Sequence, residues 1–572
     1  MRKRLLSTVC TLLFILAINA QNTDVAPDNT GMSLRAQEWD KKVVMGWNLG
    51  NSLESAGGET GWGNPATTQA MIKFVKSQGF NAIRIPVRWT EQLSDKTNMV
   101  VKDAWLNRVK EIVDWCLAED MYVIINTHHE AWLDRNPFYG QQKENNRKLA
   151  ALWKCIATFF RNYDQRLAFA GTNETVALVN GQEQWGTPNA EWQAVQNSYN
   201  QTFIDAVRAT GGKNYYRHLV VQTYACNGSS GLKGFTIPKD VVEGRLSVEF
   251  HDYDPYDYAG SGTYYYWGKK YKNMGKTTPY DDETTMKNYF DRIVNSWWKK
   301  GLGVVLGEYG ATCHYTTDDK DTQMENLQYY YNCMVSAARQ RGFAAFAWDN
   351  NAFGNGTEKF GIFRRSGGNM SVGNNYSLKG ICEGAGVEFK EPETPSGGGG
   401  SAEGTLFWEG NDLMDWSGGL QLAIPASEFE AQGKNVQLIL QYTLDYSDYD
   451  MIQLFYGDWK ENPSFIINGT TYEKEYTPDN VHGMGNGESC TSVLTFDEST
   501  YNSIIQKGIV IQGHGVRLNK VLLGNGTTGI QSINVQPSKT NNPYYYLMDG
   551  RRTTSPTHGL YIHNGQKIMI GK

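Results

Sequence analysis

The sequence has few cysteines, no excess of positive charge and only one long apolar run, which stands at its start. Its eight cysteines in 572 residues are scattered and form no Cys-x-x-Cys pair, so the usual zinc and thiol–disulfide exchange patterns are absent. Cys10 lies in the first apolar run, and the other seven are an odd number, so we expect few disulfides or none. We also expect no metal and no cofactor. The formal net charge of -6 offers no electrostatic attraction to nucleic acid.

The apolar run at the start has the features of a secretory signal peptide. Arg2-Lys3-Arg4 precedes a mostly apolar stretch from Leu5 to Ile18, and Ala20 precedes polar residues. A run this short, with a basic beginning and a small residue at its end, is typical of a cleaved signal rather than a membrane span. The sequence therefore predicts a signal peptide over residues 1–20, no membrane span, and a protein that is secreted or held at the cell surface.

Short apolar runs alternate with helical periodicity over residues 37–390. The runs begin near residues 43, 82, 122, 167, 218, 246, 304 and 343, and most are followed by an amphipathic helical pattern. Eight strand–helix repeats in ~350 residues predict a (β/α)8 barrel, the TIM barrel, with extended loops. The crossover over residues 223–245 has the weakest helical pattern.

Two further units follow the predicted barrel. Residues 391–401 are rich in Pro, Gly and Ser and predict a linker. Beyond it the helical periodicity disappears, and short strand patterns with turn-rich spacers over residues 402–525 predict an all-β sandwich. In the last segment, residues 529–572, Asn564-Gly565 between two apolar runs predicts a β-hairpin with a type I′ turn.

Two carboxylates stand at the ends of predicted barrel strands. Glu174 ends the sequence Leu167-Ala-Phe-Ala-Gly-Thr-Asn-Glu174, and Glu308 ends Val304-Val-Leu-Gly-Glu308. In a barrel the carboxyl ends of the strands form the face on which chemistry takes place. Retaining glycosidases need two carboxyl groups ~5–5.5 Å apart, one as acid/base and one as nucleophile. The pair Glu174 and Glu308 therefore predicts cleavage of a glycosidic bond.

Seven motifs in order along the chain resemble glycoside hydrolase family 5, which includes many endo-β-1,4-glucanases. Each motif follows or ends a predicted strand, and their order is more specific than any one of them. One departure is Thr175, because the family usually has Pro after the Asn-Glu pair. The motifs are Gly46–Asn51, Gly79–Trp89, Val123–Glu130, Asn173-Glu174, His251–Asp257, Gly307–Gly310 and Trp348–Asn351.

The resemblance implies the catalytic roles. Glu174 would be the acid/base and Glu308 the nucleophile. Arg84 would keep Glu308 ionised, since a neighbouring cation lowers a carboxyl pKa, and Tyr253 would donate a hydrogen bond to the same carboxylate. The pKa of Glu174 would be raised by the negative nucleophile beside it.

The resemblance also implies contacts with the sugar. Asn173 would bond the 2-hydroxyl group, His251 would lie near the acid/base, and Trp348 would offer a flat face. Trp267 would stack a sugar on the leaving-group side. Together with Arg84 and Tyr253, the predicted substrate-binding residues are Asn48, His128, His129, Asn173, His251, Trp267 and Trp348. The adjacent His128 and His129 point to opposite faces if they lie on a strand, which makes them poor ligands for one metal ion.

The β-sandwich and the C-terminal segment are less informative. A sandwich joined to a polysaccharide hydrolase is, by analogy, a carbohydrate-binding module. Trp408, Trp416 and Trp459 could form its sugar platform or fill its core. The segment containing Tyr544–Arg552 resembles C-terminal sorting or anchoring segments of secreted proteins from Bacteroidetes.

Together with the signal-peptide pattern, the resemblance to family 5 implies a secreted, monomeric, retaining endo-β-1,4-glucanase acting on a polysaccharide. Xyloglucan, mixed-linkage glucan and mannan remain alternative substrates on the same barrel. A non-catalytic glycan-binding protein of the cell surface and a barrel metallohydrolase remain alternatives from other classes.

Overall fold

The computed structural model describes residues 23–390 except 367, and residues 404–525 except 417, 447–448, 468–469, 479–480 and 482–488. It also describes the backbone of four strands between residues 545 and 570. The predicted signal peptide and the predicted linker lie outside the described residues. No helix in the described part of the chain combines the length and apolar character that crossing a bilayer requires.

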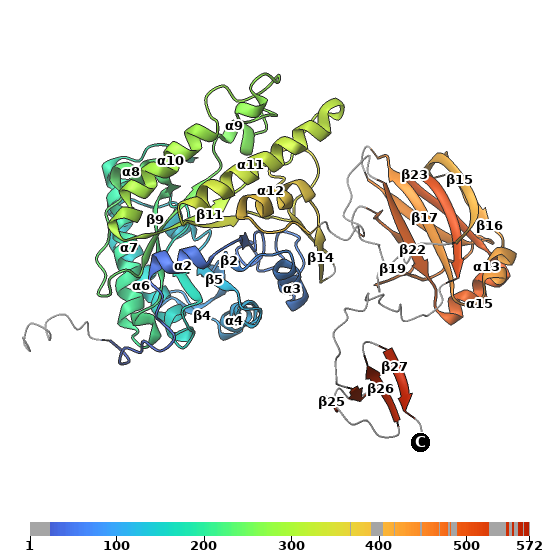
Figure 1. The fold of residues 1–572 in the computed structure, drawn as a ribbon, viewed down its shortest axis with the longest axis horizontal. Helices are drawn as coiled ribbons and strands as arrows, with labels where there is room; N and C mark the ends of the chain where they lie inside the picture. The colour runs from blue at the N-terminus through green and yellow to red at the C-terminus, as the bar shows by residue number, and fades with distance from the viewer. Residues whose placement is uncertain are drawn as a thin grey trace, which may run out of the picture.

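Eight parallel strands close into a barrel, which confirms the predicted fold (Figure 1). Each strand has its predicted place in the chain, and neighbours pair in the order β1-β12-β11-β10-β9-β6-β5-β2. The strands are β1 (Gly46–Asn48), β2 (Ala82–Ile85), β5 (Tyr122–Asn126), β6 (Leu167–Ala170), β9 (Leu219–Asn227), β10 (Leu246–Asp252), β11 (Gly303–Tyr309) and β12 (Ala344–Ala347).

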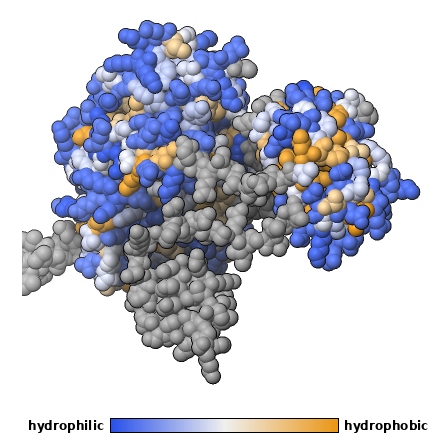
Figure 2. Space-filling view, turned by 45° about the vertical axis from the view of Figure 1, so that its right-hand side comes forward, coloured by the Kyte–Doolittle hydropathy of each residue, from blue (hydrophilic) through white to orange (hydrophobic). Residues whose placement is uncertain are grey.

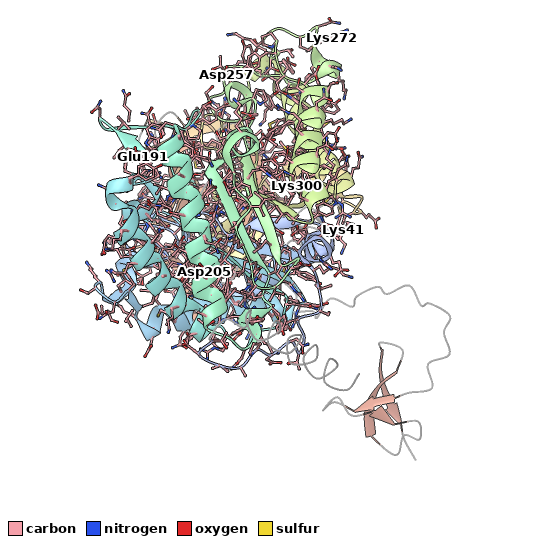
Figure 3. The ribbon with its side chains drawn as sticks, turned by 90° about the vertical axis from the view of Figure 1, so that its left-hand side faces the viewer. Lys41, Glu191, Asp205, Asp257, Lys272 and Lys300 are labelled. Atoms are coloured by element: carbon pink, nitrogen blue, oxygen red, sulfur yellow. The ribbon has the colours of Figure 1, made fainter. Side chains whose placement is uncertain are left out.

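Helices surround the barrel strands (Figure 1). The fifth crossover, which has the weakest helical pattern in the sequence, contains a helix of only seven residues, α8. Exposed charged side chains such as Asp205 of α7 and Lys300 lie on the outside of this layer (Figure 3). The helices are α3 (Gln69–Ser77), α4 (Asp103–Ala118), α6 (Tyr139–Phe159), α7 (Ala190–Ala209), α8 (Gly228–Gly234), α10 (Glu283–Ser296), α11 (Lys320–Gln340) and α12 (Asn375–Ala385).

Short elements decorate the loops of the barrel. They are the helices α5 (Ala131–Asp134) and α9 (Tyr256–Ala259), and three antiparallel pairs of strands. The pairs are β3 (Leu93–Asp95) with β4 (Val100–Val101), β7 (Leu178–Val179) with β8 (Gln182–Glu183), and β13 (Phe363–Ser366) with β14 (Asn369–Val372).

Alternation along the strands divides the barrel core into two parts. On β2, Ile83 belongs to the layer between strands and helices, whereas Ala82 belongs to a separate buried cluster inside the barrel. Because successive side chains on a strand point to opposite faces, Arg84 points into the barrel two residues beyond Ala82. This alternation places a buried cation just below the catalytic face.

The N-terminal end of the barrel is closed by α2 (Ala36–Lys42). Trp39 and Asp40 of this helix are fully buried. One carboxylate oxygen of Asp40 accepts hydrogen bonds from Ser247 Oγ at 2.8 Å and from the Val304 backbone N–H at 2.7 Å. These two residues lie at the beginnings of β10 and β11, so α2 is tied to the end of the barrel opposite the catalytic carboxylates.

The second domain is antiparallel, as predicted, and has a hydrophobic core of its own. Its strands are joined through β23, which pairs with β16 and β18 along its first half and with β15 and β17 along its second. A strand that passes from one layer to the other forms the corner of a sandwich. The elements are β15 (Gly404–Asp415), β16 (Leu422–Ile424), α13 (Ala426–Gln432), β17 (Val436–Leu444), β18 (Met451–Tyr456), β19 (Phe465–Ile467), β20 (Thr470–Tyr472), β21 (Glu475–Tyr476), β22 (Ser489–Thr495), α15 (Glu498–Lys507) and β23 (Ile509–Asn525).

The C-terminal segment forms a small antiparallel sheet in the order β25-β24-β26-β27. His563 at the end of β26 pairs with Gln566 at the start of β27, so two residues separate the strands, as the Asn-Gly signal predicts. The type of that turn lies outside the described residues. The strands are β24 (Tyr545–Leu547), β25 (Arg552–Thr553), β26 (Gly559–His563) and β27 (Gln566–Ile570).

The surfaces of the two large domains differ in hydropathy (Figure 2). Hydrophilic side chains cover most of the visible face of the barrel domain, and its apolar side chains form small groups. On the β domain apolar side chains gather into a larger group.

Candidate active site

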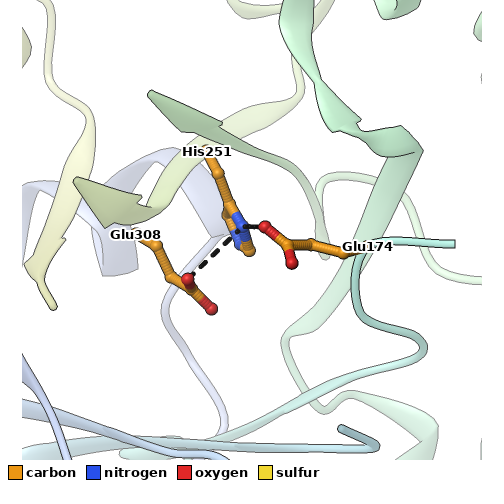
Figure 4. A group of neighbouring side chains, drawn as sticks. All are labelled: Glu174, His251 and Glu308. Carbon is orange, nitrogen blue, oxygen red and sulfur yellow. Dashed lines mark hydrogen bonds and ion pairs between the residues drawn. The ribbon is translucent and has the colours of Figure 1, made fainter. Parts of the chain in front are cut away.

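Glu174 and Glu308 face one another at the carboxyl end of the barrel, with His251 between them (Figure 4). Oε1 of Glu174 lies 2.8 Å from Nδ1 of His251, and Oε2 of Glu308 lies 3.7 Å from the same nitrogen. A carboxylate oxygen of each glutamate and a ring nitrogen all lie within 4.8 Å of one another. This spacing suits the retaining arrangement, in which ~5–5.5 Å separates the carboxyl groups, and is too short for the ~6.5–9.5 Å of inverting enzymes.

Arg84 is the central cation of the site and is completely buried. Its Nη1 donates to Glu308 Oε1 at 2.9 Å and to Asn48 Oδ1 at 2.9 Å, while its Nη2 donates to Asn173 Oδ1 at 2.6 Å. Asn48 is held in turn by its Nδ2, which donates to the Gly307 carbonyl at 2.9 Å. One guanidinium group therefore connects β1, β2, the end of β6 and β11.

The second oxygen of Glu308 accepts a hydrogen bond from Tyr253 Oη at 3.0 Å. Both oxygens of this carboxylate are thus oriented by donors, as the sequence predicts for Arg84 and Tyr253. Such fixed donors hold a carboxylate in one orientation, which favours attack on a single atom of a bound substrate.

Glu249 is a functional-site residue that the sequence analysis did not single out. It is fully buried, and its Oε1 lies 3.0 Å from Arg84 Nε and 3.2 Å from His251 Nε2. Its Oε2 accepts a hydrogen bond from Gln222 Nε2 at 2.6 Å. A Cβ on Gly307 would lie 1.9 Å from Glu249 Oε1, so the glycine before the nucleophile is required by this buried carboxylate.

The pKa shifts of Glu174 and Glu308 are opposite in direction to those expected from the sequence. Burial raises the pKa of Glu174, but the hydrogen bond and charge of His251 outweigh it and hold the pKa below its usual value. Burial raises the pKa of Glu308, against the opposing effects of His251 and Arg84. Burial lowers the pKa of His251, but Cys226 and the carboxylates of Glu308 and Glu174 raise it well above the usual range. The imidazolium of His251 therefore carries the proton next to Glu174 in the free site.

The turn that presents Glu174 is braced by the last residues of β9. Glu174 has a φ of 45°, in the left-handed region that is rare for residues other than glycine. Its backbone N–H donates to Cys226 Sγ at 3.3 Å, and the Ala225 N–H donates to the Thr175 carbonyl at 2.9 Å. Ala225 and Cys226 also have positive φ values. Thr175, which stands in place of the expected proline, is thus part of a specific contact between two neighbouring barrel strands.

His128, Asn173 and Trp348 lie together on one side of the site. His128 Nε2 lies 3.4 Å from Asn173 Nδ2, and the rings of His128 and Trp348 are nearly parallel with centroids 6.1 Å apart. Burial lowers the pKa of His128 well below its usual value, and burial lowers the pKa of His129 to about 4. Both imidazoles are neutral at pH 7 and can donate and accept hydrogen bonds.

The prediction for Trp267 is wrong. Its side chain has no exposed surface, its backbone N–H donates to Asn326 Oδ1 at 3.0 Å, and its ring packs edge-on against Tyr330. The ring fills space between the loop after β10 and α11, so no sugar can stack on it. The exposed aromatic side chains of the barrel's loops include Trp62 and Trp185, each 43% exposed.

The comparisons with known proteins agree with this geometry. The family model "Cellulase (glycosyl hydrolase family 5)" matches residues 48–354, more than half of the chain. The chain belongs to this family of glycoside hydrolases.

Individual relatives match over the barrel. Endoglucanase A of Clostridium longisporum is 36% identical over 348 residues, which are 58% of this chain and 62% of that protein. A Bacteroides ovatus family 5 xyloglucanase, solved with an XXXG heptasaccharide, superposes with a TM-score of 0.59 at 32% identity, covering 64% of this chain and 80% of that one. A broad-specificity endoglucanase structure from Clostridium longisporum gives a TM-score of 0.55 at 32% identity, covering 62% and 99%.

Proposed function

We propose that this protein is a retaining endo-β-1,4-glucanase that cleaves internal bonds of plant β-glucans, xyloglucan among them. The observation that carries the proposal is the close approach of the Glu174 and Glu308 carboxylates to the same nitrogen of His251. The endoglucanase and xyloglucanase names of the relatives support this class of substrate.

In the first step Glu308 attacks the anomeric carbon, and the bond from that carbon to the leaving oxygen breaks. Glu174 gives a proton to the departing oxygen, and a covalent glycosyl-enzyme forms. Arg84 and Tyr253 hold both oxygens of Glu308 for this attack. The proton of Glu174 comes from His251 Nδ1, 2.8 Å away, when the substrate displaces water and Glu174 loses solvation.

In the second step Glu174 acts as the base. It takes a proton from water, whose oxygen attacks the anomeric carbon and releases Glu308. Asn173, fixed by Arg84, is placed to bond the sugar's 2-hydroxyl group, where the bond can strengthen in the transition state. Two inversions give net retention of configuration.

Product analysis tests the reaction and the substrate together. Soluble β-glucan, mixed-linkage glucan, xyloglucan, xylan and mannan are incubated with the protein, and early products are examined by proton NMR and chromatography. We expect internal cleavage of β-1,4-glucans and xyloglucan, with β-anomers appearing first. A first product with the α-configuration would contradict the mechanism, and cleavage confined to mannan would contradict the substrate class.

Chemical rescue tests the role of Glu174 separately. The Glu174→Ala variant should cleave an activated aryl glycoside slowly, and added azide should restore turnover by attacking the glycosyl-enzyme. No rescue by azide would argue against Glu174 as the acid/base. A non-catalytic surface glycan-binding protein would show no hydrolysis in either assay, and a metallohydrolase would lose activity with a chelator.

We further propose that the protein is exported by its N-terminal segment and is secreted or retained at the cell surface. The basic n-region and short apolar run support export. The intact mass of the protein recovered from the producing cells tests this, because cleavage after residue 20 removes a defined mass. We expect a monomer, which light scattering tests.

A further inference from the structure

Three amide side chains and one carboxylate form a row on one surface of the β domain, from the residue before β16 across β23 and β18 to β21. Gln421 Nε2 donates to Gln512 Oε1 at 2.9 Å, and Gln512 Nε2 donates to Gln453 Oε1 at 3.0 Å. Gln453 in turn donates to Glu475. The strands register Gln453 with both Gln512 and Glu475, so these side chains share one face of the sheet formed by β16, β23, β18 and β21.

Aromatic rings lie on both sides of this row, displaced from it along the strands. On one side the rings of Trp416 and His514 are nearly parallel with centroids 5.9 Å apart, and Tyr449 lies 4.4 Å from His514. On the other side Phe455 lies 5.1 Å from Trp459. His514 and Phe455 are on the same face as the glutamines because Met451 pairs with His514 and Phe455 pairs with Val510. We call the glutamines and these rings the amide–aromatic face.

The two tryptophans have unusual backbone conformations, and Trp416 is partly buried whereas Trp459 is exposed. Trp416 has a φ of 45° and Trp459 a φ of 58°, and they are the non-glycine residues with positive φ in the described part of the β domain. Trp459 is 46% exposed and Tyr449 is 43% exposed. A left-handed conformation costs a bulky residue free energy, and such strain is often found in turns and at binding sites. Trp408 differs, because it packs against the core of the domain.

The charges on this face are paired. Asp415 lies 2.7 Å from His514 Nδ1, and Glu475 accepts from Gln453 and lies 3.5 Å from Lys474 Nζ. A face of amides, flat rings and paired charges suits a neutral, elongated ligand that has many hydroxyl groups and apolar C–H faces. Amides can both donate to and accept from hydroxyl groups, and exposed rings cover apolar ligand surface.

We propose that the amide–aromatic face binds a β-linked glucan chain that runs along the strands and crosses the row, with the rings on each side stacking on pyranose faces and Gln421 and Gln512 bonding hydroxyl groups between them. Four residues along a strand separate the two groups of rings, about 14 Å, which a short run of sugar residues spans. The choice of a glucan rests on the proposed function of the barrel. Joining two glucan-binding domains in one chain raises the local concentration of each at the polymer.

Native gel electrophoresis in gels containing a soluble β-glucan tests this site in the full-length chain. The chain carries Glu308→Gln so that the polymer is not cut, and this parent is compared with the added pair Trp416→Ala and Trp459→Ala. We expect the polymer to retard the parent, and the double substitution to weaken the apparent affinity about tenfold or more, as for anchoring aromatics at interfaces. Leu406→Ala, which removes a half-exposed apolar side chain from β15 of the same domain, is the matched control and should not change retardation.

Unfolding temperatures establish that each variant is folded, and Gln512→Ala provides a milder substitution if the double variant is not. Equal retardation of folded parent and variants would overturn the proposal. A change from dimer to monomer on removing the tryptophans would also overturn it, because the face would then bind a second copy. Failure of the barrel's proposed function appears separately, as absence of β-glucan hydrolysis by the chain with Glu308 intact.

Discussion

The carboxyl end of the barrel and the amide–aromatic face of the β domain use opposite physical means. In the barrel, Arg84, Glu249 and His251 are buried charges connected at 3.0–3.2 Å through Glu249. On the β domain, Gln421, Gln512 and the two tryptophans make an accessible surface on which the charges are paired. Burial in the first case shifts pKa values and fixes geometry, whereas exposure in the second leaves rings available for contact.

This difference separates chemistry from attachment. Breaking a glycosidic bond requires charges that are already oriented and poorly solvated before the substrate arrives. Holding a polymer requires area and hydrogen bonds, with little reorganisation. Substitutions in the barrel should therefore act on kcat and its pH dependence, and substitutions on the β domain should act on affinity for the polymer.

The largest effect is expected for Glu308→Gln. An amide cannot form the glycosyl-enzyme, so kcat on soluble β-glucan should fall at least about 10³-fold. Initial rates measured by release of reducing ends check this, with the unfolding temperature as the control for structure. A rate near that of the wild type would remove Glu308 from the mechanism.

Trp267→Ala compares a buried tryptophan of the barrel with Trp459, which is exposed on the β domain. Because Trp267 is completely buried, its truncation should cost about 3–5 kcal/mol of unfolding free energy through the cavity left behind. Denaturant unfolding measures this. If stability stayed unchanged while KM for oligosaccharides rose, Trp267 would contact the sugar rather than support the core of the barrel domain.

Glu249→Gln tests whether a buried carboxylate that does not face the substrate controls the protonation of His251. Losing this carboxylate, 3.2 Å from His251 Nε2, should lower the pKa of His251. Because His251 has a raised pKa, its charged form is lost as pH rises through that value, so the alkaline limb of the kcat profile should move to lower pH. We also expect kcat at the optimum to fall about 10–100-fold, as for other supporting residues behind a reactive group.

The pH profile distinguishes this positioning role from a purely structural one. A structural role would lower the amount of active protein without moving the limb. Glu249→Asp keeps the charge and should restore the position of the alkaline limb, even if the shorter side chain lowers kcat.

The sequence predicts the barrel and its two carboxylates well because both signals are local. Apolar runs and helical periodicity mark each strand–helix unit. Glu308 lies at the end of β11, and Glu174 lies a few residues beyond β6. The prediction for Trp267 is wrong because a tryptophan can either stack on a sugar or pack in a core. Which of the two occurs depends on Tyr330 of α11, a residue distant in the sequence. The signal for Glu249 was present, since a charged residue in an apolar strand two positions before His251 points to the same interior face.

In the β domain the sequence predicts the strand boundaries less well. The sequence predicts two strands, Gly508–Gln512 and Val516–Leu523, because glycines interrupt the apolar pattern, where the structure has the single strand β23. Gly515 has a φ of 63°, and a Cβ on Gly513 would lie 2.3 Å from the Met451 carbonyl. These glycines allow the strand to pass from one layer to the other rather than ending it. Pairing with four other strands, which determines this path, involves residues far apart in the sequence.

The smallest effect is expected for Thr175→Val, beside the acid/base. The hydroxyl of Thr175 is buried and has no hydrogen-bond partner among the described residues. Valine has the same shape without the unpaired polar group, so the substitution should raise the unfolding free energy by about 1 kcal/mol. Its backbone carbonyl still accepts from Ala225, so the turn and kcat should be retained. A fall in kcat without loss of stability would show that the hydroxyl, and not only the backbone of this turn, positions Glu174.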